Sequence, residues 1–247
     1  FMQKIGFLFC VKRGVTLGGN SKARKMAFKF AEDFMKKTLI LLFALSGFAQ
    51  ADDHAMDTYY AYYGITTTNP PAVVAAMDKF NASECGQKTP STVALMAETF
   101  NGGEASTHTF VVTYEGSKVL DETLAILSTC PDYATFLTEM AEISEPTEQN
   151  LVKKLYEQGD WTKDTVFAGF EMNIKNEDAY LTAYKKMTDA MVEQGQLTSS
   201  YGLERVIAGT DFSHFAFIGG QNVTSLMETL DLLDMKNPDF KEFQTGW

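Results

Sequence analysis

The chain has 247 residues, of which 45% are hydrophobic and 13% aromatic, and its formal net charge is −11. This composition is typical of a folded protein of one or two domains and excludes a disordered or fibrous chain. Three cysteines are too few for a disulfide-dense scaffold, and the lack of any uncharged apolar run of about 18 residues excludes a multi-span membrane protein.

A signal-peptide pattern lies near the start of the sequence. Met-Lys-Lys at 35–37 precedes a short apolar run at 38–45 and the sequence Ala-Gln-Ala at 49–51. A basic segment, an apolar segment and a small-residue cleavage site in this order are typical of bacterial Sec export; a short buried helix is the alternative. We therefore predict that residues 1–34 are upstream translation outside the fold, that 35–51 are a Sec signal peptide, and that the protein is periplasmic or secreted.

Removal of this leader makes the protein strongly acidic. Residues 1–51 contain nine of the 21 basic residues but two of the 32 acidic ones, so the rest of the chain carries 12 basic and 30 acidic groups, a net charge of −18. An acidic surface without a basic stripe repels phosphate backbones. We expect no nucleic-acid partner and, after signal cleavage, no membrane partner.

Two cysteines remain after the leader is removed. Cys10 lies within the leader, whereas Cys85 and Cys130 would enter an oxidising compartment. An even pair in such a compartment favours a disulfide bond. A bridge requires the two Cα atoms to lie within about 7 Å of each other. The predicted helices do not obviously bring Cys85 and Cys130 that close, so two small buried thiols are the alternative.

Apolar periodicity and turn residues divide the chain after residue 57 into strands and helices. The first part is predicted as strand 58–66, helix 72–80, strands 92–100 and 107–114 on either side of a glycine turn, and a helix from 118 that Pro131 breaks and that resumes at 132. The second part is predicted as strand 165–174, helix 177–193, strands 200–207 and 213–218, and helix 223–235. Both parts therefore have the order strand, helix, strand, strand, helix.

Sequence matches at an offset of about 106 residues indicate an internal repeat. Short motifs recur in the same order: Asn69-x-x-Ala72 as Asn176-x-x-Ala179, Thr107-His108 as Ser213-His214, Glu122-Thr123-Leu124 as Glu228-Thr229-Leu230, and Pro131-Asp132-Tyr133 as Pro238-Asp239-Phe240. Chance rarely supplies such matches colinearly, so we predict a duplication.

A strand-helix-strand-strand-helix order with a following strand is typical of the ferredoxin-like unit, whose helices cover one face of the sheet. On this order and the duplication, the chain resembles the dimeric α/β barrel superfamily, which contains antibiotic-biosynthesis-type monooxygenases, haem-degrading monooxygenases, chlorite dismutase relatives and stress-responsive barrel proteins. The resemblance implies an α+β fold in which ferredoxin-like repeats at 57–160 and 161–247 pack sheet to sheet as a pseudo-dimeric α/β barrel. It includes no catalytic signature, so no site residue is transferred.

Two segments depart from this repeat. A fourth strand should lie near 150–157, but the apolar residues there have helical spacing. The second repeat ends soon after Pro238, which leaves no room for a fourth strand. We therefore expect the second sheet to be incomplete, or the sequence to be truncated.

The first strands of the two repeats supply the candidate ligand site. Their alternation places one wholly apolar or aromatic face under the helices and a mixed face between the two sheets. The mixed face presents Tyr60, Tyr62, Phe167, Glu171 and Asn173. An aromatic cavity with a few polar groups suits a small molecule; the alternative is that the tyrosines simply fill the barrel.

Two combinations of a glutamate and a histidine flank the predicted hairpins. Glu98 and His108, and likewise Glu204 and His214, would lie opposite or diagonal to each other across a hairpin. Such a carboxylate would raise the pKa of the histidine and orient its ring for proton transfer or metal binding. A structural cross-strand pair is the alternative.

The amino terminus left by signal cleavage is a third candidate site. Cleavage after Ala51 would place His54 third from a free amine, where Cu(II) or Ni(II) can bind in a square-planar set of nitrogens. An untethered polar terminus is the alternative. The Gly-x-Ser-x-Gly, His-Glu-x-x-His, Cys-x-x-Cys, Walker and Rossmann glycine motifs are all absent from the sequence, so the common enzyme signatures are missing.

These observations predict an exported protein that binds a small, mainly apolar or aromatic ligand between its two ferredoxin-like halves. The alternative is a cofactor-free or haem-dependent monooxygenase-like enzyme of the dimeric α/β barrel type that uses Tyr60, Tyr62 and Glu171. The sequence assigns neither a particular cofactor nor an oligomeric state.

Overall fold

The computed structural model describes residues 2–10 and 57–245 of the chain. The predicted signal peptide at 35–51 and His54 lie outside these residues. Within them, no helix combines the length and the apolar character that a membrane span requires.

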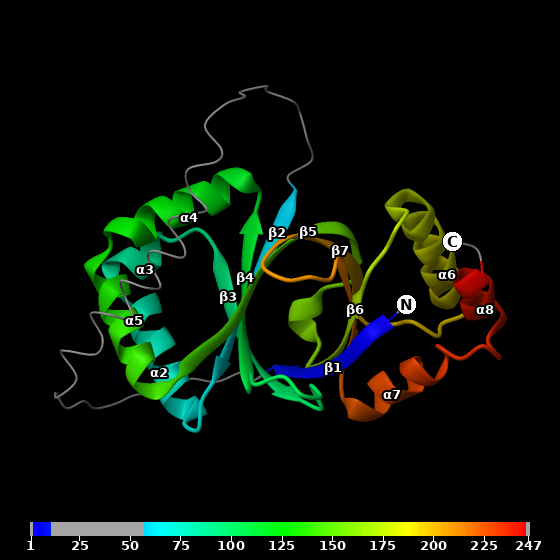
Figure 1. Cartoon of the computed structure of the whole chain (residues 1–247), viewed down its shortest axis with the longest axis horizontal. Helices are drawn as coiled ribbons and strands as arrows, with labels where there is room; N and C mark the ends of the chain where they lie inside the picture. The colour runs from blue at the N-terminus through cyan, green and yellow to red at the C-terminus, as the bar shows by residue number, and fades with distance from the viewer. Residues whose placement is uncertain (1, 11–56, 246–247) are drawn as a thin grey trace.

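Seven strands form one curled antiparallel sheet: β2 (Thr58–Thr66), β3 (Thr92–Thr99), β4 (His108–Glu115), β5 (Glu145–Gln158), β6 (Val166–Met172), β7 (Tyr201–Ala208) and β8 (His214–Gly220). Their order in the sheet is β3-β4-β2-β5-β7-β8-β6. An eighth strand, β1 (Met2–Cys10), pairs with β3 at one edge and with β6 at the other, so the sheet closes into a barrel (Figure 1).

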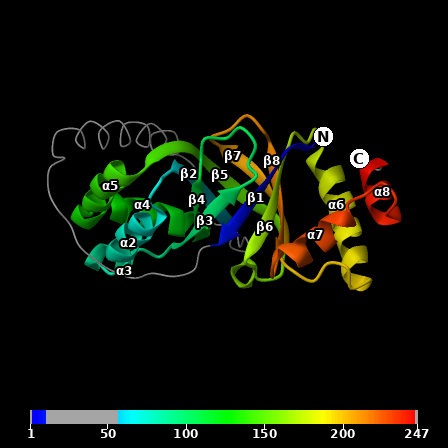
Figure 2. The same cartoon turned by 90° about the horizontal axis from the view of Figure 1, so that it is seen from below.

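Helices cover the outside of the barrel in two groups on opposite sides (Figure 1 and Figure 2). The first group is α2 (Pro70–Asn81), α3 (Glu84–Lys88), α4 (Ser117–Thr129) and α5 (Pro131–Ile143). The second group is α6 (Glu177–Glu193), α7 (Val223–Asp231) and α8 (Pro238–Thr245), and a short 3₁₀ turn, η2 (Trp161–Lys163), precedes β6. The fold is therefore α+β, with helices on the outer face of the sheet and the inner face buried against itself.

Local sequence signals fix where the long helices begin. Asn69 accepts a hydrogen bond from the backbone N–H of Ala72 at 3.3 Å and precedes two prolines, so α2 starts with a capped first turn. Asn176 caps α6 in the same way, accepting from the N–H of Ala179 at 3.2 Å. Pro131 separates α4 from α5, because proline has no N–H to continue the helical ladder.

Both halves have the element order that the sequence predicts. The strands of the first half lie side by side as β5-β2-β4-β3, and in the second half β6, β8 and β7 occupy the positions of β2, β4 and β3. β1 lies beside β6, in the position that β5 has beside β2. Each half of the barrel thus has four strands in the ferredoxin-like arrangement.

The placement of β1 differs from the expectation that residues 1–34 stand outside the fold. Met2–Cys10 pairs with β6 along most of its length, and with β3 at its other edge. Without this strand, the edges of β3 and β6 would present unpaired backbone N–H and C=O groups. The second sheet therefore has a fourth strand, which the pattern of the second repeat does not predict because the strand comes from the opposite end of the chain.

β5 is a second difference from the sequence-based expectation. Residues 150–157 have helical apolar spacing, yet they form a strand that pairs with β2 on one side and β7 on the other. The register with β7 shifts between Lys154 and Tyr156, and Leu155 and Tyr156 both pack against the helix-side core of the second half. Such a bulge breaks the two-residue alternation of a strand, and the apolar residues then resemble a helix pattern.

Three hydrophobic clusters follow from the alternation of side chains along the strands. Tyr60 and Phe167 belong to the cluster inside the barrel. Ile65 packs under α2 and α5, and Phe170 packs under α6 and α8. The strands thus bury one face against helices and the other inside the barrel, as their period of two predicts.

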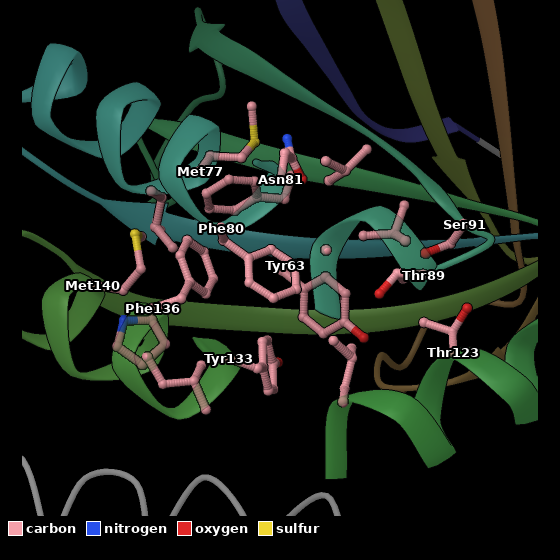
Figure 3. A pocket seen from close by; sticks show the side chains of 18 of the residues that line it. Tyr63, Met77, Phe80, Asn81, Thr89, Ser91, Thr123, Tyr133, Phe136 and Met140 are labelled. Atoms are coloured by element: carbon pink, nitrogen blue, oxygen red, sulfur yellow. The ribbon is translucent and has the colours of Figure 1, made fainter. Parts of the chain in front are cut away.

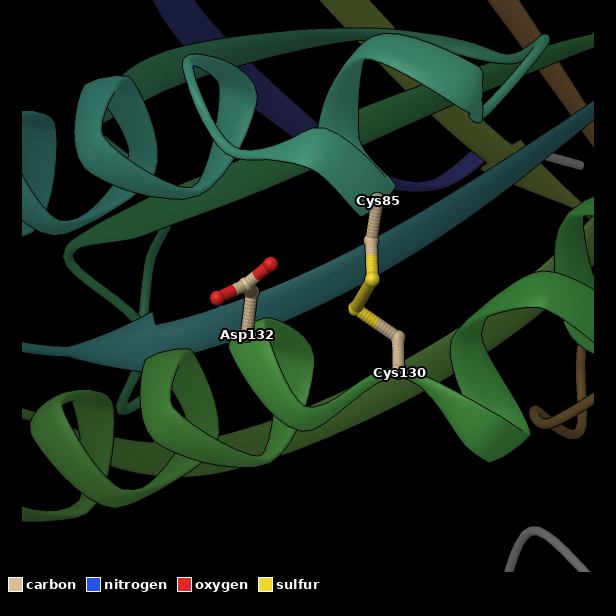
Figure 4. Close-up of side chains that lie close together, drawn as sticks. All are labelled: Cys85, Cys130 and Asp132. Atoms are coloured by element: carbon tan, nitrogen blue, oxygen red, sulfur yellow. A yellow bond between two sulfur atoms is a disulfide. The ribbon is translucent and has the colours of Figure 1, made fainter.

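A disulfide bond joins Cys85 of α3 to Cys130 at the start of α5, with 6.1 Å between the two Cα atoms (Figure 4). The structure thus has the bridge rather than two free thiols. Asp132 lies close to the two sulfur atoms. Metal ions bind thiolates, and both sulfur atoms are used by the bridge, so this group is not a metal site.

Replacement of both bridged cysteines by serine is expected to lower the free energy of unfolding by about 4 kcal/mol, because the bond closes a loop between positions that are 45 residues apart. Urea unfolding followed by circular dichroism measures the change. Dithiothreitol should reproduce the loss in the unsubstituted protein and have no effect on the double variant. An equal effect of the reductant on both proteins would contradict the assignment.

Candidate functional site

The inside of the barrel is filled mainly by aromatic side chains. Tyr60, Tyr62 and Phe167 point into it, as the strand alternation predicts, and Phe215 and Phe217 of β8 pack beside them. The cavity that they leave has a volume of about 40 Å³, which is room for no more than a few water molecules. The ligand space expected between the two halves is therefore occupied by the protein itself.

Two tyrosine–carboxylate pairs lie in this interior. The hydroxyl of Tyr62 donates to both carboxylate oxygens of Glu204, at 3.0 and 3.1 Å, and the hydroxyl of Tyr60 donates to Glu157 at 2.6 Å. Glu204 is 1% exposed. Burial raises the pKa of Glu204 to about 8, although the hydrogen bond from Tyr62 opposes the shift. Burial also raises the pKa of Glu157, so both carboxyl groups hold a proton more readily than exposed ones.

Some of the predicted site residues reach this cavity and others do not. Its lining includes four of them: Tyr60, Tyr62, Phe167 and Glu204. Glu171 is partly buried on β6, and Asn173 is exposed just beyond the end of that strand. Within the described part of the chain, neither of these two lines the interior cavity.

The predicted pairs Glu98–His108 and Glu204–His214 are not formed. In each hairpin the histidine pairs with the residue next to the glutamate, so the two are one position out of step. An offset of one residue places side chains on opposite faces of a sheet. Each glutamate therefore points into the barrel, while its histidine lies on the helix-covered face.

Glu98 and His108 have other partners. The carboxylate of Glu98 accepts hydrogen bonds from Asn101 Nδ2 at 2.8 Å and from Ser106 Oγ at 2.6 Å, and so holds the loop of the first hairpin. His108 is hydrogen-bonded through Nδ1 to Thr107 Oγ1 at 3.0 Å. Burial lowers the pKa of His108, which is the opposite of the predicted direction.

His214 belongs to an ion-pair network on the outer face of the second half. Its Nε2 atom lies 2.9 Å from a carboxylate oxygen of Glu177, and its Nδ1 atom lies 2.7 Å from Ser213 Oγ. Arg205 donates to the same carboxylate through two nitrogens, and these bonds lower the pKa of Glu177 to about 2. The network ties the start of α6 to β7 and β8, which is a structural role.

A larger cavity, of about 180 Å³, lies on the helix-covered face of the first half. Residues of β2, β3 and β4 form its floor, residues of α2, α4 and α5 form its walls, and the segment around α3 closes one end (Figure 3). The alternation of the first strand predicts that this face packs under helices. The cavity is smaller than the pockets of drug-sized ligands, but it is large enough for a molecule of about one aromatic ring.

One end of the cavity is mainly apolar, with Asn81 beside Met77 and Phe80, and the other end bears hydroxyl groups (Figure 3). The apolar end contains Met77, Phe80, Phe136 and Met140, and the hydroxyl-bearing end contains Thr89, Ser91 and Thr123. The rings of Phe80 and Phe136 stand 5.5 Å apart between centroids. Among the described residues that line the cavity, none is charged. The surroundings therefore favour a neutral ligand with one polar side.

Three tyrosines also line the cavity: Tyr63, Tyr114 and Tyr133. Burial raises the pKa of each hydroxyl, and at Tyr63 a hydrogen bond with Tyr114 offsets part of the rise. All three are therefore neutral near pH 7. They can exchange hydrogen bonds with a ligand, but they supply no negative charge.

The corresponding space in the second half is filled. Tyr180 and Tyr184 of α6 pack against Phe240 and Phe243 of α8, and the rings of Tyr180 and Phe243 are 5.1 Å apart between centroids. The cavity left there has a volume of about 30 Å³. Between helices and sheet, the first half thus has more room than the second. The second half has a different pocket, of about 500 Å³, which lies between α6 and α8 and is lined by exposed charged residues such as Asp178, Lys186 and Glu242.

Comparison with known proteins bears on the fold. No family model matches the chain, and no curated protein matches it. The structure is similar to that of a putative monooxygenase from Fusobacterium nucleatum subsp. nucleatum, with a TM-score of 0.50, 13% sequence identity, and coverage of 78% of this chain and 86% of that one. This likeness shows the dimeric α/β barrel, or ferredoxin-like, fold that the sequence resemblance implied.

Two further likenesses are weaker. A putative monooxygenase from Lactobacillus acidophilus has a TM-score of 0.49 at 12% identity, with coverage of 76% of this chain and 85% of that one. A chlorite dismutase from Candidatus Nitrospira defluvii has a TM-score of 0.47 at 7% identity, with coverage of 77% and 86%.

Glu204 is expected to make the stability of the protein depend on pH. Its folded-state pKa of about 8 exceeds the ordinary value of 4.5. At a pH between these two values, the folded protein therefore keeps a proton on Glu204 that the unfolded chain has lost. The free energy of unfolding should therefore fall as the pH rises from about 5 to about 8, by at most about 1.4 kcal/mol per pH unit. Urea unfolding at several pH values measures the slope.

The substitution Glu204→Gln should flatten this slope, because an amide does not titrate. Glu122→Gln is the matched control, since Glu122 is an exposed residue of α4 and its change should leave the slope as it was. A slope that is the same in Glu204→Gln and in the unsubstituted protein would contradict the role of Glu204.

Proposed function

We propose that the protein binds a small, mainly apolar or aromatic molecule in the cavity between the sheet and helices α2–α5 of its first half. The observation that carries this proposal is the cavity itself, which measures about 180 Å³ and is lined mostly by aromatic and aliphatic side chains. An apolar protein cavity of about 150 Å³ binds benzene. A ligand of about one aromatic ring therefore fits here.

We also propose that the two halves arose by duplication. Matched positions make matched hydrogen bonds: Thr107 Oγ1 accepts from the N–H of Thr67 at 3.0 Å, and Ser213 Oγ accepts from the N–H of Ile174 at 2.9 Å. The asparagine caps of α2 and α6 match as well. These recurrences support a common origin, after which the helix-side spaces of the two copies diverged.

A haem group does not suit the cavity. Pockets for drug-sized ligands measure about 300–1,000 Å³, well above the volume here. Haem iron also needs an axial ligand; among the described lining residues there is no histidine, and burial keeps the tyrosines protonated. We therefore derive no haem-dependent step for this chain.

A cofactor-free, monooxygenase-like activity is the second candidate function. Its support is the fold likeness to a protein described as a putative monooxygenase, together with a cavity that suits an aromatic substrate. A likeness at 13% identity extends to the fold alone, so binding is the better supported function. Oxygen uptake that depends on an aromatic ligand would favour the enzyme, and its absence would favour the binding protein.

Export is a separate part of the proposal and rests on the signal pattern at 35–51. The Cys85–Cys130 bridge supports it, because disulfides persist mainly in oxidising compartments. Cleavage after Ala51 would also release Met2–Cys10, and the edges of β3 and β6 would then be open to another strand. The exported form and the barrel closed by β1 are therefore two different states of the chain.

Toluene is expected to raise the melting temperature of the protein, because a ligand that binds the folded state stabilises it. Isothermal titration calorimetry should show one site. Val112→Phe adds a ring to the wall of the cavity and should abolish both effects. Ile207→Phe makes a similar addition at an exposed position of β7 and should leave both unchanged; binding that survives Val112→Phe would count against the cavity.

Expression of the 247-residue chain in a bacterium is expected to yield a periplasmic form that begins at Asp52. Intact-mass spectrometry of the periplasmic fraction checks this. Ala51→Arg should block cleavage, since the site requires a small residue, whereas Ala55→Arg should not. Recovery of the unsubstituted protein at full mass from the cytoplasm would show that export does not occur.

A further inference from the structure

Thr123 of α4 lies on the wall of the proposed ligand cavity (Figure 3). The residue is 1% exposed, and its Oγ1 atom has no hydrogen-bond partner among the residues that the structure describes. Buried polar groups without a partner are rare, because burial removes their bonds to water and nothing replaces them. The unpaired hydroxyl of Thr123 therefore needs an explanation.

Several other threonines on the helices bond to their own helix. Thr135 and Thr138 of α5 donate to the carbonyl oxygen four residues earlier, at 3.1 and 2.9 Å, as helical threonines commonly do. Thr229 of α7 matches Thr123 in the sequence repeat, and it donates to the carbonyl oxygen of Ser225 at 3.1 Å. The hydroxyl of Thr123 is thus unpaired, whereas the hydroxyl of Thr229, at the matching position of the second half, has a hydrogen bond.

We infer that a ligand supplies the missing partner: the cavity binds a neutral aromatic molecule with a hydroxyl group, and Thr123 forms a hydrogen bond with that group. This inference rests on the proposed binding function and adds the chemical class of the ligand. Thr89 and Ser91 lie at the same end of the cavity as Thr123 (Figure 3), so a ligand hydroxyl there has several polar neighbours. The aromatic ring of the ligand would then pack against the aromatic and aliphatic side chains that line the rest of the cavity.

The lining also determines the charge of the ligand. Of the residues that the structure describes around the cavity, none is Asp, Glu, Lys, Arg or His. A carboxylate or ammonium group would lose its hydration there without gaining an opposite charge. A phenol is neutral near pH 7 and needs only one or two hydrogen bonds, so it suits both ends of the cavity.

The test compares phenol with toluene, which have the same ring and differ in a hydroxyl or a methyl group. Isothermal titration calorimetry on the full chain gives the dissociation constant of each, with benzoate as the charged analogue that should not bind. Thr123→Val, which replaces the hydroxyl by a methyl group, should weaken phenol binding about fivefold and leave toluene binding unchanged or tighter. Thr229→Val is the matched control and should alter neither.

Melting temperatures show whether the variants fold. Thr123→Val should melt no lower than the unsubstituted protein, because it removes a buried hydroxyl that has no partner. Thr123→Ser keeps a hydroxyl and should keep the effect of phenol on the melting temperature. If the valine variant does not fold, the serine variant and Thr123→Ala provide the same comparison.

The possible outcomes separate this inference from the function on which it rests. If Thr123→Val changed the dissociation constants of phenol and toluene equally, the proposed hydrogen bond would be wrong, but the proposed ligand cavity would not be contradicted. Benzoate binding as tight as that of phenol would overturn the neutral class of ligand. If the unsubstituted protein binds neither phenol nor toluene, the proposed function fails and the inference fails with it.

Discussion

The burial of the inner sheet faces against each other determines where this protein has room for a ligand. Helices cover only the outer face of each half, so the inner faces, with Tyr60, Phe167 and Phe217, must pack together to leave water. Large aromatic side chains fill the space between the inner faces, and the cavity that remains has a volume of about 40 Å³. The interior of the barrel is therefore a core, and the larger apolar space against the sheet lies where helices meet the outer face of the first half.

Equivalent elements serve different purposes in the two halves. In the second half, Phe240 and Phe243 of α8 pack onto α6 and fill the helix-side space. In the first half, the matching segment is the longer helix α5, which begins at Pro131 and leaves a cavity of about 180 Å³ beneath it. The contrast between Thr123, which is unpaired, and Thr229, which is bonded to its own helix, follows the same division. One half is consistent with a stabilising role and the other with the proposed binding role.

The sequence predicts which strand faces are buried but not which residues meet across the strands. Alternation correctly places Tyr62 and Phe167 inside the barrel. The partners of Glu98 and Glu204 depend on register, and an error of one residue moves a histidine to the opposite face. A bulge hides β5, and β1 lies far from its neighbours in sequence. The cavity could not be predicted, because its volume depends on how far the helices stand from the sheet, which no local pattern specifies.

An open cavity loses van der Waals contacts, so the protein needs features that stop the helices from closing over it. The disulfide holds α3 to the start of α5. Gly86 lets α3 lie against α2, since a Cβ atom there would be 2.0 Å from the carbonyl oxygen of Phe80. These two constraints fix three of the helical elements around the cavity before any ligand arrives. A site that is already open needs little rearrangement on binding, so less of the interaction energy with the ligand is lost to ordering the protein.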